Sequence, residues 1–204
     1  MTARSAALLI PLFSARTPRD AGIGEITAIV GEPAQLTHTA ASAVTALRIS
    51  LATCREVISR NGLADAMLRL REQRQFLLGT WLFGEMISFH VLHRLAKAIE
   101  RRTAAPGSEP GLDGGLGLLI KGRVVLASAT GTVGELAPGD FWGEGGILCR
   151  TTPVTARAAT AAEFYLVPAT EIAAIPIVTW KLIETCDRRR NHDNARGAPG
   201  CVGA

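Results

Sequence analysis

The sequence lacks the residue patterns that mark the commonest enzyme sites. It has no G-x-S-x-G nucleophile turn, no H-E-x-x-H zinc pair and no P-loop lysine. The glycine-rich stretch 111–117 resembles a dinucleotide loop only superficially, because no strand is expected before it. Together with the residues from Pro106 on, it is typical of a flexible turn. The sequence therefore predicts a protein that is not an enzyme.

Paired cysteines and metal-ligand clusters are also missing. No C-x-x-C spacing occurs among the four cysteines, Cys54, Cys149, Cys186 and Cys201. Neither a zinc site nor a redox couple is indicated. We interpret the four cysteines as buried thiols in a reducing cytoplasm. His90 and His93 lie one helical turn apart, but two histidines alone make a poor metal site. We expect no metal and a cytoplasmic protein.

A membrane-spanning or secretory segment is not evident at the N-terminus. The apolar run 6–13 is too short to cross a bilayer, and no small-residue cleavage pattern follows it convincingly. Residues 1–20 are expected to form an irregular or disordered arm. A membrane-touching anchor, supported only by Arg4 and Arg16, is the alternative.

The net charge of +4 does not indicate nucleic-acid binding. Basic residues are dispersed along the expected helices and alternate with Glu72, Glu85 and Glu100; they are Arg69, Arg71, Arg74, Arg94, Lys97, Arg101 and Arg102. The one dense run, 188–190, lies at a helix end, where cations complement the macrodipole. The tail 191–204 is expected to be disordered, and it is too short to form a DNA-binding domain.

What the sequence does contain is a glycine-rich turn that suits a small anion. Pro138, Gly139 and Asp140 predict a tight turn that ends a strand. After it, Gly143, Gly145 and Gly146 surround Glu144 and lead into a short apolar helix that begins near Ile147. Backbone amides at such a helix start can approach a phosphate without steric hindrance. An ionised Glu144 only accepts hydrogen bonds, so it suits a ribose hydroxyl.

The chain length of 204 residues suits one to two small domains, and 48% of the residues are hydrophobic, which is enough for a core. The residues around the turn predict that the second domain is rich in β-strands. We expect strands 116–120 and 124–127 to form a hairpin through the Lys121-Gly122 turn. A third strand is expected at 132–136, two more at 155–160 and 163–167, and helices at 169–175 and 179–190.

This order of elements resembles the cyclic-nucleotide-binding domain family of catabolite-activator-type regulators, protein kinase A regulatory subunits and gated channels. The resemblance covers residues 80–190 and implies an α+β fold, a jelly-roll-like double-stranded β-helix with flanking helices. It implies a regulatory, signal-transducing module with cAMP or cGMP as ligand. The family's phosphate-binding cassette is matched by Gly139, Asp140, Trp142, Gly143, Glu144, Thr155 and Ala156.

The cassette departs from the family at the arginine that pairs with the cyclic phosphate, where this chain has Val154. Such a charge-assisted contact contributes about 1.5–3 kcal/mol, so its loss predicts an affinity lower by roughly tenfold or more. Arg157 points to the opposite strand face. Arg150 is expected to be a solvated loop residue, although it could reach in from its loop.

A reduced form of the pattern lies upstream, in residues 21–79. Gly24-Glu25 and Thr37 echo Gly143-Glu144 and Thr155, and the family arginine position falls at Ala34 or Gln35. A strand at 44–49 and helices at 53–60 and 63–76 are expected to follow. Only about twenty residues precede this copy's Gly-Glu pair, too few for a full roll, so we expect a partial first copy.

The expected long helix 63–76 carries Leu63, Met67, Leu70 and Phe76 at mostly three- and four-residue spacing. The resemblance implies that it pairs in a homodimer or covers the ligand. The apolar pattern resumes from Trp81 to 99 as the helices that open the second copy.

Two functions from different classes fit these observations. The first is a regulatory sensor in which Glu144 binds the ribose and the amides of 143–147 bind the phosphate, with weak or no cyclic nucleotide binding. The second is a structural or protein-interaction domain of a truncated tandem sensor, its pocket filled by side chains such as Trp142. Val154 favours the second at ordinary nucleotide concentrations.

Overall fold

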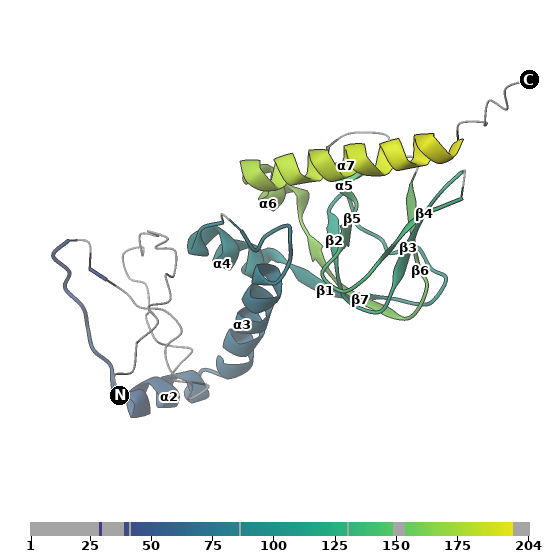
Figure 1. Cartoon of the computed structure of the whole chain (residues 1–204). Coiled ribbons are helices and arrows are strands. Elements are labelled where there is room, and N and C mark those ends of the chain that lie inside the picture. Colours follow the sequence, from purple (N-terminus) through teal and green to yellow (C-terminus); the bar gives the residue numbers. More distant parts are fainter. Residues whose placement is uncertain are drawn as a thin grey trace, which may run out of the picture.

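The computed structural model describes residues 29, 39–40, 42–85, 87–129, 131–148 and 154–197. Helices dominate both ends of the described chain, and strands occupy its middle (Figure 1). The elements are α2 (Leu51–Arg60), α3 (Ala64–Leu78), α4 (Phe89–Ala98), β1 (Glu100–Ala104), β2 (Leu116–Lys121), β3 (Val124–Ser128), β4 (Gly131–Leu136), β5 (Phe141–Trp142), α5 (Glu144–Ile147), β6 (Thr155–Ala158), β7 (Ala162–Val167), α6 (Ala169–Ala173) and α7 (Pro176–Gly197).

The strands form two antiparallel sheets, with order β1-β7-β2-β5 in one and β4-β3-β6 in the other. The expected α+β class is therefore confirmed. The expected hairpin of 116–120 with 124–127 is wrong, because β2 pairs with β7 and β5, whereas β3 pairs with β4 and β6. The turn at Gly122, with φ 92°, carries the chain from one sheet into the other.

Two apolar cores explain this separation. The inter-sheet core joins both sheets and comprises Leu119, Val124, Leu126, Leu136, Trp142, Ala158, Ala162 and Phe164. The helix-side core lies on the opposite face of the four-stranded sheet, where Leu116 and Leu118 meet helical residues such as Leu95 and Leu182. Because β2 is buried on both faces, it takes the centre of its sheet and not one arm of an exposed hairpin.

The N-terminal helices follow the sequence closely. The expected helices 53–60 and 63–76 are confirmed as α2 and α3, and the Ser50 hydroxyl caps α2 by accepting from the Thr53 amide at 3.1 Å. The strand expected at 44–49 is wrong: this stretch is unpaired, with Leu47 88% exposed. Its alternating apolar residues have no neighbouring strand to pair with among the described residues.

The segment 81–99, expected as helices, is helical only in part. Residues 81–83 form turns, and the helix begins only at α4, where the Ser88 hydroxyl accepts from the Val91 amide. Arg101 and Arg102, expected on a helix, lie on β1, an edge strand that pairs with β7. Their side chains stay in solvent and bind Glu163 and Asp113, which suits an exposed sheet edge.

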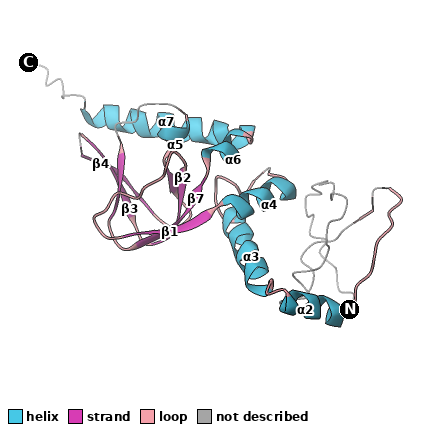
Figure 2. Cartoon of the chain, turned by 180° about the vertical axis from the view of Figure 1, so that it is seen from behind, coloured by secondary structure: helices cyan, strands magenta, loops and turns pink. Residues whose placement is uncertain are grey.

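The C-terminal helix is longer than the sequence indicated. The helix expected at 179–190 is α7, which begins at Pro176 and continues to Gly197, so the first residues of the expected disordered tail are helical. Proline is compatible with a helix start because its missing amide would have had no intrahelical partner. Figures 1 and 2 show α7 running along one side of the sheets, beside α5 and β4. In the described part of the chain, no helix is long and apolar enough to cross a membrane.

Candidate functional site

The turn before β5 has the predicted geometry. The Asp140 carboxylate accepts from the Ala137 amide at 2.8 Å, and the Asp140 amide donates to the Ala137 carbonyl at 3.0 Å. Gly139 has φ 97°, a conformation that glycine adopts without strain. The Gly139 amide donates to the carbonyl of Leu119 in β2 at 2.8 Å, and the Leu119 amide donates to the Asp140 carbonyl at 2.9 Å, so the turn is held against β2.

Gly143 is required by both its backbone and its neighbours. It has φ 98°, and a Cβ there would lie 2.4 Å from Leu112 Cδ1 and 2.8 Å from the Gly115 carbonyl oxygen. A short helix does follow it, α5, but it begins at Glu144 and ends at Ile147, where the sequence predicted its start; the Leu148 amide donates to the Glu144 carbonyl at 3.0 Å. Glycine at 143 therefore places Glu144 under α7.

The Glu144 carboxylate already has a cationic partner. Arg189 Nη1 donates to Glu144 Oε1 at 2.7 Å, with side-chain exposures of 18% for Arg189 and 7% for Glu144. Arg189 Nη2 donates to the Phe141 carbonyl at 2.8 Å, and the guanidinium lies 5.4 Å from the Phe141 ring centroid. The sequence analysis considered only Val154, Arg157 and Arg150 as the place of a cation, whereas the guanidinium beside Glu144 comes from α7, forty-five residues away.

The sequence assigned the run 188–190 to a helix end, where cations complement the macrodipole, but α7 continues to Gly197, so Arg189 lies within the helix. Arg188 and Arg190 do pair within α7, with Glu184 and Asp187. The signal that separates Arg189 is helical spacing, since it follows the buried Leu182 and Cys186 by seven and three residues. It therefore lies on the buried face of α7.

The residues 154–156 are divided between two faces of β6. Ala156 pairs with Leu126, and together with Val154 it packs against the inter-sheet core. Thr155 is exposed and lies with Arg157 on the outer face of the sheet. The prediction that Arg157 points away from the side of Val154 is consistent with this alternation.

Trp142 fills part of the space between the sheets. It is 2% exposed, its ring packs on Phe164 at 5.2 Å between centroids, and its Nε1 has no hydrogen-bond partner among the described residues. Opposite it, a Cβ on Gly117 would lie 2.4 Å from the indole. The inside of the two sheets at this point is therefore apolar and packed.

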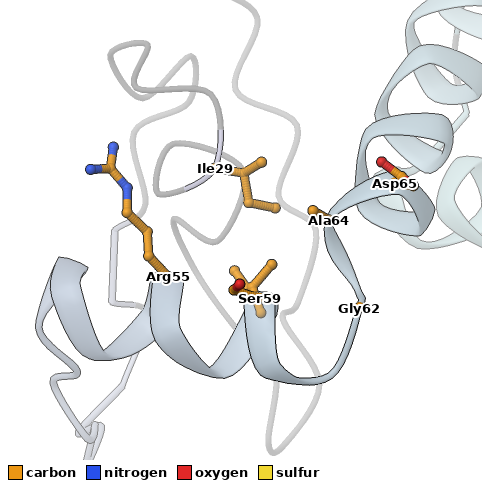
Figure 3. A pocket seen from close by; sticks show the side chains of 7 residues that line it. Ile29, Arg55, Ser59, Gly62, Ala64 and Asp65 are labelled. Atoms are coloured by element: carbon orange, nitrogen blue, oxygen red, sulfur yellow. The ribbon is translucent and has the colours of Figure 1, made fainter.

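Two of the hollows among the described residues lie elsewhere. One lies on the outer face of β3 and β6 and is lined by Val125, Thr155 and Arg157, among others. The other, about 330 Å³, lies between α2 and the start of α3, where Arg55, Ser59 and Asp65 surround it (Figure 3). Neither is lined by Gly143, Glu144 or Val154.

Some predicted residues fall outside the described part of the chain, namely Gly24, Glu25 and Thr37 of the partial first copy, and Arg150, Cys149 and Cys201. The described residues bring no three histidine, cysteine, aspartate or glutamate side chains together as a metal site. Of the predicted cassette, Gly143, Glu144 and Gly145–Ile147 form one continuous turn and helix start. Ile147 packs against the helix-side core.

Searches by sequence gave no relationship: no family model matches, and no curated protein matches. Solved structures do match the fold. The cAMP-bound regulatory subunit PfPKA-R superposes with a TM-score of 0.58 at 16% identity, covering 72% of this chain and 54% of that one.

Two trypanosome structures match similarly. The regulatory subunit of a cAMP-independent protein kinase A from Trypanosoma cruzi, bound to guanosine, has a TM-score of 0.52 at 21% identity over 69% of this chain and 54% of that one. A triple mutant of the Trypanosoma brucei subunit, bound to cAMP, has a TM-score of 0.53 at 18% identity over 70% and 56%. The chain spans about half the length of these neighbours. It has the fold of cyclic-nucleotide-binding regulatory domains.

Proposed function

We propose that this chain is a regulatory module of the cyclic-nucleotide-binding fold whose degenerate cassette binds cAMP and cGMP weakly or not at all. The observation that carries the proposal is Val154, which packs an apolar side chain against the inter-sheet core. An arginine there would point to the same side and could pair with a phosphate. Without it, the negative charge of a cyclic phosphate has no cation at this strand.

The turn at Gly143 would form the rest of the cassette. Glu144 would accept from a ribose hydroxyl, and the amides of Gly143, Gly145 and Ile147 would face the phosphate, whereas the Gly146 amide donates to the Gly143 carbonyl at 3.2 Å. Thr155 and Ala156 are the remaining residues of the proposed cassette. In this proposal residues 80–190 form the module, with the two sheets as a jelly-roll-like roll, and residues 21–79 are a partial copy.

The names of two structural neighbours support a cassette of this kind. One is a cAMP-independent regulatory subunit bound to guanosine. The other carries a threonine replaced by arginine, the adjoining valine by alanine and a glutamate by alanine, and it is bound to cAMP. We infer from these names that a set of substitutions that includes one new arginine is compatible with cAMP binding in this fold.

The second candidate is a structural or protein-interaction domain without a ligand, in which α3 pairs with its copy in a homodimer. Trp142 favours it, since the buried indole occupies the inter-sheet core next to Gly117. A module packed in this way needs no ligand to complete its core.

Calorimetric titration with cAMP and cGMP tests the proposal. We expect no saturable heat at micromolar nucleotide for the unaltered chain and measurable binding for Val154→Arg. Val154→Met is the matched control, because it changes the same side chain without adding a charge. Thermal unfolding confirms that both variants are folded.

Tight, saturable binding by the unaltered chain would contradict the proposal. Folded Val154→Arg that binds neither nucleotide would favour the structural domain over the sensor. Sedimentation equilibrium of the full chain then tests that alternative, since a homodimer through α3 doubles the mass.

A further inference from the structure

The outer face of the three-stranded sheet carries a hollow of about 490 Å³, within the range of about 300–1,000 Å³ that small-molecule sites occupy. Its floor is made by side chains of β3 that face away from the inter-sheet core. Ala127 lies opposite Thr155, and Val125 lies opposite Arg157. Both β3 side chains are half-buried, so the floor of the hollow is apolar.

The loop after β1 forms one wall of the hollow and is held by backbone hydrogen bonds. The Gly107 amide donates to the Ala158 carbonyl at 2.7 Å, and the Ala158 amide donates to the Ser108 carbonyl at 2.9 Å. The backbone pairing of β3 with β6 fixes the floor. The hollow is therefore formed before any ligand arrives, as is usual for small-molecule sites.

Arg157 lines this hollow and has no close carboxylate partner. Among the described residues its ion pair is with Glu109, at 4.0 Å between nitrogen and oxygen, which is too long for a hydrogen bond. The two side chains are 64% and 63% exposed. Arg123 differs, because its Nη1 lies 3.2 Å from Glu135 Oε1 and it does not line the hollow. Arg157 therefore offers guanidinium donors beside an apolar surface.

We propose that this hollow is a binding site for a small carboxylate with a short acyl chain, its carboxylate on Arg157 and its chain over Val125 and Ala127. Guanidinium and carboxylate match each other through two parallel hydrogen bonds. A monoanion suits the site, because Glu109 lies beside the guanidinium and would repel a doubly charged phosphate more strongly. The site is separate from the proposed function, since the turn and helix start 143–147 do not line it.

Titration of the isotope-labelled full chain with hexanoate, followed by NMR, tests the proposal. We expect saturable shifts of the amide signals of β3 and β6, with a Kd on the order of 1 mM for so small a ligand. Hexanamide keeps the acyl chain without the charge, and acetate keeps the charge without the chain. Each of them should bind at least tenfold more weakly than hexanoate.

Variants separate the guanidinium from the floor. Arg157→Met removes the charge and Ala127→Leu fills the hollow, so each should lower the affinity for hexanoate at least tenfold. Arg123→Met is the matched control, because it removes a neighbouring arginine that does not line the hollow, and it should leave the affinity unchanged. Glu109→Gln should raise the affinity, because it removes the carboxylate next to Arg157. Thermal unfolding confirms that the variants are folded.

Absence of saturable shifts in the unaltered chain would overturn the proposal. So would unchanged affinity for hexanoate in folded Arg157→Met or folded Ala127→Leu. Binding of hexanamide as tight as that of hexanoate would overturn it as well, because the guanidinium would then have no part in recognition.

Discussion

Trp81 stacks on Phe141, with 6.2 Å between ring centroids and 4° between ring planes. Trp81 belongs to the turn after α3, and Phe141 begins β5. A cation from α7 lies at each end of this pair: Lys181 Nζ is 4.9 Å from the Trp81 ring centroid and 2.5 Å from its carbonyl oxygen, and Arg189 lies over Phe141. These four side chains connect the turn after α3, the cassette turn and α7.

Replacement of Trp81 should weaken this junction. Loss of one aromatic pair costs about 0.5–1.5 kcal/mol and loss of a cation–π contact about 0.5–2 kcal/mol, so Trp81→Ala should lower the free energy of unfolding by roughly 1–3 kcal/mol. Urea unfolding measures the change. Trp180→Ala is the control, since Trp180 is 59% exposed and has no ring contact among the described residues. Equal losses in both variants would refute a special role for the Trp81 stack.

Gly143 and Gly146 should respond differently to alanine. Gly143→Ala forces a side chain into a left-handed conformation, at about 1–2 kcal/mol, and against Leu112. A Cβ on Gly146 meets nothing within 4 Å, and its φ is not positive. We expect Gly143→Ala to lower the thermal midpoint clearly and Gly146→Ala to leave it nearly unchanged. A tolerant Gly143→Ala would mean that the turn before α5 can relax.

The single tyrosine offers a test by pH. Burial raises the pKa of Tyr165, with a smaller opposing effect from Arg101 and a raising one from Glu72. The phenol therefore ionises later in the folded chain than in the unfolded one. Its contribution to stability is complete below pH of about 10 and is lost as the pH rises toward the folded pKa.

Ultraviolet titration of the phenolate should show ionisation above the usual tyrosine range, and Tyr165→Phe should remove this part of the alkaline loss of stability. The Phe76 ring packs edge-on against Tyr165 at 5.2 Å and is retained in this variant. A normal titration in the folded chain would contradict the burial of Tyr165 on the helix-side core.

Local signals in the sequence determined the turn before β5 and the start of α2. Proline, glycine and aspartate at 138–140 specify a turn through their own backbone preferences, and Ser50 starts α2 by capping it. Gly143 before Glu144 fixes the start of α5 in the same way. These effects act over a few residues, so a sequence pattern suffices to find them.

Only the tertiary structure decided which strands pair and what Glu144 binds. The residues of β2 and β3 are adjacent in sequence, yet burial of both faces of β2 placed them in different sheets. β1 became a strand because β7 offered it an edge to pair with. Arg189 reaches Glu144 because α7 packs its buried face across the cassette. Such contacts depend on how distant apolar surfaces fit together, and the local preferences of the residues involved do not encode them.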